Sequence, residues 1–280
     1  PFGPDWSIGR TSARAAAGAV GHLVSIRLVA SDLDGTLMRR DKSISERSIV
    51  AMERAQAAGI RIVLATARGR GTVGTIARDA RFSGYAICGN GAVVLDLADD
   101  ARVIHQTSID SQAASRVMAL IRDLAPGTVF GLVGTHDFLM EPGYRDLSAF
   151  EDHWLDPTAI PVADPLVGIE AGVIKIVARH PELATADLFR ILAGAAREHV
   201  EVTHSLAPFV EMAALGVTKA TTLAELCATW GIDRGEVAAV GDALNDLPML
   251  EWAGLALAPA NAEAEVRAAA DRILPSNEED

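Results

Sequence analysis

Short apolar runs alternate with segments of helical periodicity over the first third of the chain. Each run is followed directly by polar residues, which is typical of a buried strand that ends at the edge of a sheet. Between the first two runs, Ile49 and Met52 recur at helical spacing, and either Ser43 or Ser45 could cap the helix. Strand–helix alternation predicts a parallel sheet with right-handed crossovers. The predicted strands cover residues 26–30, 60–65 and 85–88, and the predicted helices cover 45–58 and about 72–79.

The pattern changes in the middle of the chain. The segments Val93-Val94-Leu95 and Arg102-Val103-Ile104 flank Ala98-Asp99-Asp100, which indicates a hairpin, and more strands and helices follow without strict alternation. Because these strands are expected to pair with near neighbours in sequence, we predict a separate α+β unit inserted into the first domain. Alternation resumes afterwards, so the fold class is α/β, a doubly wound, Rossmann-like parallel sheet with an inserted α+β cap. The expected units are an extension or leader (1–26), the core (27–88 and 213–280) and the cap (89–212).

Composition and charge narrow the possible functions. The 280 residues are 50% hydrophobic and 22% charged, a balance that excludes disorder along the whole chain. Acidic residues outnumber basic ones 37 to 25, and the net charge of −12 is the wrong sign for a binder of phosphate backbones. We therefore expect no nucleic-acid partner.

The location in the cell is predicted from two features of the sequence. Two cysteines, Cys88 and Cys227, are too few for a disulfide framework, which favours a reducing compartment. No apolar run reaches the roughly 18 residues of a membrane span, so no membrane partner is expected. We predict a cytoplasmic protein, and the sequence pattern indicates no particular oligomeric state.

Polar side chains follow the carboxyl ends of several predicted strands, where open parallel sheets bind their ligands. Several carboxylates meeting at one edge would repel one another unless a cation lay among them. Oxygen ligands without Cys or His point to Mg²⁺, and hydroxyl and ammonium donors nearby suit an anion. Together they describe phosphoryl transfer. The residues are Asp32, Asp34, Thr66, Arg68, Asn90, Asp242, Asn245 and Asp246, with Lys219 at the start of a helix.

Taken singly, these residues have simpler explanations. Asp-x-Asp-Gly is also the pattern of a tight turn, a calcium loop or a glycosyltransferase metal motif. Asn90 before Gly91 is a common turn pair, and Asn245-Asp246 could cap the helix that follows. The seven histidines show no metal-ligand spacing, so none is assigned to a metal.

Four motifs in order resemble those of the haloacid dehalogenase (HAD) superfamily. They are Asp32-Leu33-Asp34-Gly35, Ala65-Thr66-Ala67-Arg68, Lys219 and the run Gly241-Asp242-Ala243-Leu244-Asn245-Asp246. The segment Gly89-Asn90-Gly91-Ala92 and the mid-chain insertion look like those of the Cof-like phosphatases, which carry an α/β cap between the second and third motifs. The second motif has Ala67 where this group usually has glycine.

The resemblance implies a role for each aspartate. Asp32 would be the nucleophile that forms an aspartyl-phosphate, and Asp34 would be the general acid and base. Mg²⁺ would be held by the side chains of Asp32 and Asp242 and by the backbone carbonyl of Asp34, with Asp246 nearby.

The resemblance also implies which residues hold the substrate. Thr66 and Lys219 would bind the phosphoryl group, and Lys219 would also neutralise Asp32. Asn245 would contact phosphate, and Arg68 and Asn90 are candidate substrate contacts.

These motifs lead to a Mg²⁺-dependent phosphatase of small phosphorylated metabolites. Sugar phosphates are the substrate class that the resemblance favours, with pyridoxal phosphate next. One alternative is a phosphotransferase or phosphomutase that passes the same aspartyl-phosphate to a second sugar. Another is a non-catalytic regulatory or binding protein that uses the fold as a scaffold.

Overall fold

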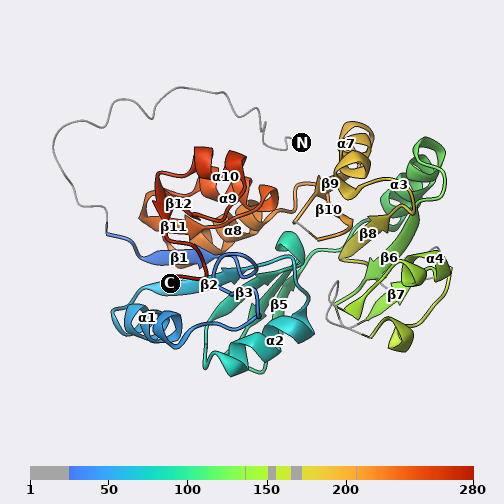
Figure 1. Cartoon of the computed structure of the whole chain (residues 1–280). Coiled ribbons are helices and arrows are strands. Elements are labelled where there is room, and N and C mark those ends of the chain that lie inside the picture. The colour runs from blue at the N-terminus through green and yellow to red at the C-terminus, as the bar shows by residue number, and fades with distance from the viewer. Residues whose placement is uncertain (1–24, 136, 151–155, 165–171, 206) are drawn as a thin grey trace, which may run out of the picture.

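Two β-sheets with separate hydrophobic cores make up the chain (Figure 1). The structure is a computed structural model that describes residues 25–135, 137–150, 156–164, 172–205 and 207–280. The larger sheet has eight strands in the order β13-β12-β11-β1-β2-β3-β4-β5, and the smaller has five in the order β7-β6-β8-β10-β9. The predicted α/β class with an inserted unit is thus confirmed.

The larger sheet forms the core that the sequence predicts. Strands from β13 to β3 run parallel, with β1 between β11 and β2. Its strands are β1 (Leu28–Ser31), β2 (Arg61–Ala65), β3 (Tyr85–Cys88), β4 (Val93–Asp96), β5 (Arg102–Gln106), β11 (Val237–Val240), β12 (Leu255–Pro259) and β13 (Arg272–Leu274). Its helices are α1 (Glu46–Ala57), α2 (Arg70–Asp79), α8 (Lys219–Trp230), α9 (Leu247–Trp252) and α10 (Ala264–Ala269).

Helices cover both faces of this sheet (Figure 1). Alternate strand residues such as Val63 and Ala65 pack against α8, α9 and α10. Ile62 and Leu64 point to the other face and pack against α1 and α2. A sheet buried on both faces has apolar strands throughout, which explains the continuous apolar runs in the sequence.

The predicted hairpin after β3 belongs to the larger sheet and not to the inserted unit. The short helix η1 (Gly89–Gly91) reverses the chain, and β4 then pairs antiparallel with β3, with Cys88 opposite Val93. β5 pairs antiparallel with β4 in turn. The expected inserted unit, residues 89–212, therefore includes strands that extend the core. Local pairing was the basis of that expectation, and a hairpin pairs locally whichever sheet it joins.

The inserted unit is an antiparallel sheet with α3 and α7 on one face and the short α4 on the other. The chain crosses between the two sheets after β5 and again after β10. Side chains such as Ile176 and Met212 form one core with α3 and α7. The unit comprises β6 (Val129–Val133), β7 (Phe138–Met140), β8 (Lys175–Arg179), β9 (Val200–Thr203), β10 (Val210–Ala214), α3 (Ser111–Leu124), α4 (Pro142–Asp146) and α7 (Thr185–Ala195).

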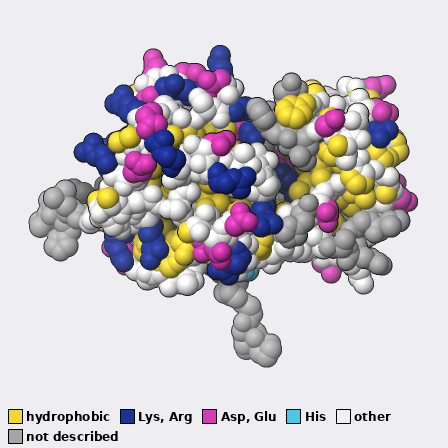
Figure 2. Space-filling model, turned by 90° about the horizontal axis from the view of Figure 1, so that it is seen from below, with side chains coloured by type: hydrophobic (Ala, Val, Ile, Leu, Met, Phe, Trp, Pro, Cys, Tyr) yellow, Lys and Arg dark blue, Asp and Glu magenta, His cyan; other side chains and the backbone are white. Residues whose placement is uncertain are grey.

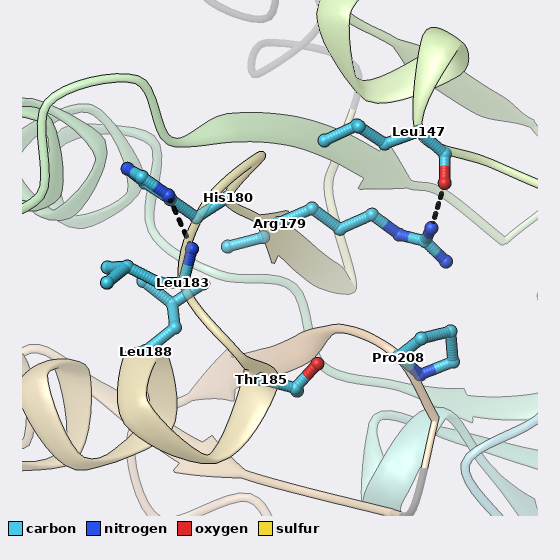
Figure 3. Close-up of a pocket in the computed structure, with 8 residues that line it drawn as sticks. Leu147, Arg179, His180, Leu183, Thr185, Leu188 and Pro208 are labelled. Atoms are coloured by element: carbon cyan, nitrogen blue, oxygen red, sulfur yellow. Dashed lines mark hydrogen bonds between the residues drawn. The ribbon is translucent and has the colours of Figure 1, made fainter.

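A cavity of about 150 Å³ lies within the inserted unit (Figure 3). Arg179 lines it and donates a hydrogen bond to the carbonyl of Leu147. The guanidinium carbon of Arg179 lies 5.3 Å from the ring centre of Tyr144 and 5.5 Å from that of Phe209, which are cation–π distances. None of the residues expected at the active site lines this cavity.

Local signals in the sequence explain where two helices of the core begin and end. Ser45 accepts a hydrogen bond from the backbone N–H of Ser48 and caps α1, as its position predicts. Thr218 caps α8 in the same way through Thr221, and Gly231 ends that helix in the left-handed conformation. The cap at Thr218 makes Lys219 the first residue of α8.

Within the residues that the structure describes, every helix is too short or too polar to cross a membrane. The expected extension or leader, residues 1–26, lies almost entirely outside the described residues. On the face shown in Figure 2, basic and acidic side chains are interspersed over the core.

Candidate active site

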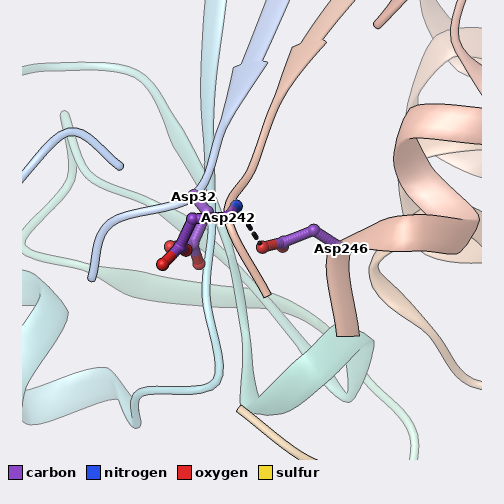
Figure 4. A group of neighbouring side chains, drawn as sticks. All are labelled: Asp32, Asp242 and Asp246. Carbon is purple, nitrogen blue, oxygen red and sulfur yellow. Dashed lines mark hydrogen bonds between the residues drawn. The ribbon is translucent and has the colours of Figure 1, made fainter. Parts of the chain in front are cut away.

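The predicted site residues meet where the parallel strands end. Asp32 follows β1, Thr66 follows β2 and Asp242 lies two residues after β11. All three side chains are buried, as are those of Asn90, Lys219, Asn245 and Asp246. Figure 4 shows the carboxyl groups of Asp32 and Asp242 side by side, with Asp246 facing them from the start of α9. Segments more than 200 residues apart in the sequence thus contribute to one cluster.

Lys219 joins two of the buried aspartates. Its Nζ lies 2.6 Å from Oδ1 of Asp32 and 2.7 Å from Oδ1 of Asp246. Burial opposes the charge of Lys219, but the two carboxylates outweigh that effect and raise the pKa of the ammonium group. Lys219 is therefore a fixed positive charge beside Asp32.

Asp246 has its carboxylate fully engaged within the protein. One oxygen binds Lys219, and the other accepts hydrogen bonds from the backbone N–H groups of Asp242 and Ala243 at 3.0 and 3.1 Å. This arrangement makes Asp246 a support for Lys219 and for the Asp242 loop. Asp246 stands at the N-cap position of α9, but its side chain makes no capping hydrogen bond to that helix and instead binds the backbone that precedes it.

The donor set suits a divalent cation. Asp32, Asp242 and Asp246 offer carboxylate oxygens that all lie within 4.8 Å of one another, and Lys219 supplies one positive charge against their three negative charges. Burial and the neighbouring carboxylates raise the pKa of Asp242 to about 7. Burial, opposed by Lys219, likewise raises the pKa of Asp32 well above its ordinary value. A cation bound by oxygen ligands would offset this excess negative charge.

Gly35 brings the loop after Asp34 against Asp242. A Cβ atom at this position would lie 2.1 Å from Oδ2 of Asp242, and the φ angle of +77° also favours glycine. Thr36 donates a hydrogen bond to Oδ1 of the same carboxylate at 3.1 Å. The backbone of the first motif therefore packs directly on Asp242.

Asp34 has a different environment from Asp32. Its two oxygens accept hydrogen bonds from Arg68 at 2.5 and 2.6 Å, and Lys42 lies 3.0 Å from Oδ1. Burial favours the neutral form, but these two cations outweigh it and lower the pKa of Asp34. The carboxyl group is thus ionised in this arrangement, whereas a general acid must hold a proton when substrate arrives.

Two amides lie beside the cluster with hydrogen-bonding capacity left. Asn245 donates to Oδ1 of Asn90 at 3.0 Å. Among the described residues, the buried Nδ2 of Asn90 and Oδ1 of Asn245 have no partner. Thr66 accepts a hydrogen bond from the backbone N–H of Arg68, which leaves its hydroxyl proton for a second partner. Asn90 and Thr66 can supply donors to an anion bound near Asp32, whereas the unpartnered atom of Asn245 is an acceptor.

Sequence reasoning did not find two lysines that contact this region. Lys42 binds Asp34, and Lys175 of the inserted unit binds the carbonyl of Ala67 at 2.9 Å. A signal for both exists in the composition, because only three of the 25 basic residues are lysines. The third is Lys219.

Comparison with known proteins agrees with this arrangement. The profile of the haloacid dehalogenase-like hydrolase family matches residues 29–280. The chain is 26% identical over 260 residues to the 5-amino-6-(5-phospho-D-ribitylamino)uracil phosphatase YcsE of Bacillus subtilis, covering 92% of this chain and 93% of that protein. It is 26% identical over 269 residues to the pyridoxal phosphate phosphatase YbhA of Escherichia coli, covering 92% and 96%.

The fold is also that of a solved HAD phosphatase. The phosphatase BT1666 of Bacteroides thetaiotaomicron, a HAD enzyme, superposes with a TM-score of 0.75 at 24% identity, covering 94% of this chain and 95% of that structure. The chain therefore belongs to the haloacid dehalogenase-like hydrolase family and is a phosphoric monoester hydrolase of its Cof-like group.

Proposed function

We propose that the protein hydrolyses phosphate monoesters of small metabolites through an aspartyl-phosphate on Asp32, with Mg²⁺ as the cofactor. The observation that carries this proposal is the buried ion pair of Asp32 with Lys219 beside Asp242. A buried carboxylate paired with a fixed cation at a strand end is placed to attack a bound anion.

Asp32 and Asp242 would hold the cation with the Asp34 carbonyl, and Gly35 keeps that backbone against Asp242. Bound Mg²⁺ would offset the negative charge of the attacking carboxylate and of the phosphoryl oxygens. Both oxygens of Asp246 already accept hydrogen bonds, so Asp246 would hold Lys219 and the Asp242 loop and would lie near the cation, in contact with it through water.

The first chemical step falls to Asp32 and Asp34. Lys219 binds Oδ1 of Asp32, so Oδ2 forms the bond to phosphorus while the bond from phosphorus to the leaving oxygen breaks. Thr66, Lys219 and the free amide of Asn90 donate hydrogen bonds to the phosphoryl oxygens. Asp34 gives a proton to the leaving oxygen, which an alkoxide needs.

Asp34 must be released from Arg68 before it can carry that proton. The guanidinium of Arg68 can instead bind the phosphoryl group, because both carboxylate and phosphate suit its paired donors. Once Arg68 turns to the substrate, the interaction that most lowers the pKa of Asp34 is gone. In the second step Asp34 takes a proton from water, and the water oxygen replaces Asp32 on phosphorus.

Sugar phosphates are the substrate class we propose first, with pyridoxal phosphate next. Two relatives support this order, one a phosphatase of a phosphoribityl compound and the other a pyridoxal phosphate phosphatase. The general acid at Asp34 also suits an alcohol leaving group, which is poor without protonation.

The test is release of inorganic phosphate from a panel of phosphorylated metabolites, with and without Mg²⁺. We expect turnover that is lost in EDTA and restored by Mg²⁺ or Mn²⁺ but poorly by Ca²⁺, which prefers more ligands and a looser geometry. The Asp32→Asn variant is the control for a contaminating phosphatase. Full activity in EDTA would reject the metal assignment, and no release from any member of the panel would reject the function.

A further inference from the structure

One buried cation of the inserted unit contacts residues 66–68, the segment of the core that follows β2. Lys175 is the first residue of β8, and its Nζ donates to the carbonyl of Ala67 at 2.9 Å and to Oε1 of Glu211 at 2.7 Å. Lys175 is 7% exposed and Glu211 is 1% exposed. The mechanism above uses neither residue.

Strand geometry explains how the pair reaches the core. On β8, Ile176 and Ala178 pack on the helices of the inserted unit, so Lys175 lies on the opposite face. Glu211 of β10 is opposite Val177, which is two residues after Lys175 on β8 and on the same face. Glu211 can therefore reach Lys175 diagonally across the two strands. Ser205 donates to the second oxygen of Glu211 and completes its hydrogen bonding.

Stability alone is a weak reason for such a pair. Two charges lose their hydration when they are buried, and well-packed apolar residues in their place are often as stable or more so. The chain also uses arginine for most of its cations and has only three lysines. The other two are bonded to Asp32 and Asp34, which places every lysine of the chain at this site.

Ala67 lies between two residues with assigned roles. In the proposed mechanism its neighbour Thr66 donates a hydrogen bond to the phosphoryl group, and Arg68 controls the protonation of Asp34. A hydrogen bond from Lys175 to the Ala67 carbonyl fixes the orientation of the peptide group that joins Ala67 to Arg68. The hydrogen bond joins the inserted unit to the core, so it forms only when β8 packs against residues 66–68.

We propose that Lys175, held by Glu211, is a positioning residue that fastens the cap to residues 66–68 and so aligns Thr66 and Arg68 for catalysis. This inference rests on the proposed function for its effect on rate. The contact itself can be tested separately, by the accessibility of the amine.

The kinetic test compares two variants. Lys175→Met alone would leave Glu211 buried without its cation and destabilise the cap, so the test variant is Lys175→Met/Glu211→Gln, which removes both charges. Glu211→Gln alone is the matched control, because glutamine still accepts a hydrogen bond from Lys175 and Lys175 can still donate to Ala67. This control also leaves one buried charge unpaired, so its melting temperature measures that cost separately from the rate. We expect the double variant to lose about 10- to 100-fold in kcat/KM, mainly in kcat, since a charged hydrogen bond contributes about that factor. The control should stay within about threefold, a change of less than about 1 kcal/mol.

Circular dichroism and thermal unfolding establish that both variants are folded. A purely structural role would lower the melting temperature of the double variant while its folded fraction kept the wild-type kcat. A folded double variant with wild-type kcat/KM would therefore overturn the proposal, as would an equal loss in the Glu211→Gln control.

The second test uses the scarcity of lysine and needs no activity. Reductive methylation followed by peptide mass spectrometry reads each of the three lysines separately. We expect Lys42, with its side chain 34% exposed, to react at least about tenfold faster than Lys175, whose ammonium group is bonded and buried. Equal rates would show that the cap is not fastened in solution and would overturn the inference, even if the phosphatase activity were demonstrated.

Discussion

Asp32 and Asp34 are two residues apart and have opposite electrostatic surroundings. Burial raises the pKa of Asp32, with Asp246 and Asp242 adding to that effect and Lys219 opposing it. Arg68 and Lys42 overcome burial at Asp34 and lower its pKa. Two carboxyl groups with different environments can take different roles in one reaction. In the proposed mechanism Lys219 orients the first, and Arg68 controls whether the second can hold a proton.

The Asp32→Asn variant tests the nucleophile. Asparagine keeps the shape but lacks the attacking oxygen anion, so we expect kcat to fall by at least about three orders of magnitude. The metal-free variant should be no less stable than the wild type at pH 8, because one buried like charge is removed. Steady-state kinetics and thermal unfolding measure the two effects. Near wild-type turnover in a folded variant would exclude the covalent mechanism.

The Asp34→Asn variant separates proton transfer from the other roles of this residue. We expect slow formation of the aspartyl-phosphate from a sugar phosphate, whose alkoxide needs a proton, and nearly normal formation from p-nitrophenyl phosphate. The second step lacks its base with either substrate, so steady-state rates would hide the difference. Rapid-quench single turnover should show a burst of p-nitrophenol followed by slow turnover. Equal slowing of the first step would mean that Asp34 holds the loop or the metal instead.

The contacts of single residues differ in how far the sequence could predict them. Asp32, Thr66 and Asp242 follow apolar strands directly, so the edge of the sheet brings them together once the strands are recognised. The contacts of Lys42 and Lys175 depend on where a loop and a second sheet settle on the core. No periodicity in the sequence encodes that placement, and the rarity of lysine is a signal that the sequence analysis did not use.

At the scale of elements, the loop after β1 and the loop after β11 form the site by close contact. The Gly35→Ala variant should weaken both folding and metal binding, because its Cβ would collide with Asp242 and the φ angle of +77° is strained for alanine. We expect a loss of about 2–4 kcal/mol in the free energy of unfolding and at least about tenfold weaker Mg²⁺ binding. Urea unfolding and a Mg²⁺ titration are the measurements.

Gly59→Ala is the matched control for this variant. Its φ angle is +81°, and no atom lies within 4 Å of the position that a Cβ would take. The control therefore carries the backbone strain without the collision, and should lose about 1 kcal/mol with Mg²⁺ binding unchanged. If the two variants were equally destabilised and bound Mg²⁺ equally, contact with Asp242 would not be the reason for glycine at position 35.

The bounds of helices and strands were predicted correctly where the apolar pattern coincides with a capping or turn residue at the end of the element. Strand β3 has the predicted bounds, and α1 begins after Ser45 as expected. The sheet to which a hairpin belongs was not predictable in the same way. β4 and β5 pair through local turns, and the choice between extending the core and starting the cap depends on η1, where Asn90 has a left-handed φ angle of 59°.

At the scale of the whole molecule, the carboxylates buried together at the site make the stability of the fold depend on pH. A raised pKa means that the folded state holds the proton more tightly than the unfolded chain. Metal-free stability from Asp32 and Asp242 is thus fully present below the ordinary pKa of 3.8 and is lost as the pH rises through the folded pKa, about 7 for Asp242. Asp34, whose pKa is lowered, behaves oppositely, and its contribution is lost only at acid pH.

The stabilisation by Mg²⁺ should therefore grow with pH. Between pH 5.5 and pH 8 the metal-free protein should lose about 2 kcal/mol through Asp242, since one pKa unit corresponds to about 1.4 kcal/mol. Mg²⁺ competes with the protons for the same oxygens and restores that loss, so the rise in melting temperature on adding Mg²⁺ should be larger at pH 8. Asp242→Asn should abolish this difference, and Asp100→Asn, at a side chain 93% exposed, should leave it unchanged. An increment that was equal at both pH values in the wild type would mean that the buried carboxylates are not the metal site.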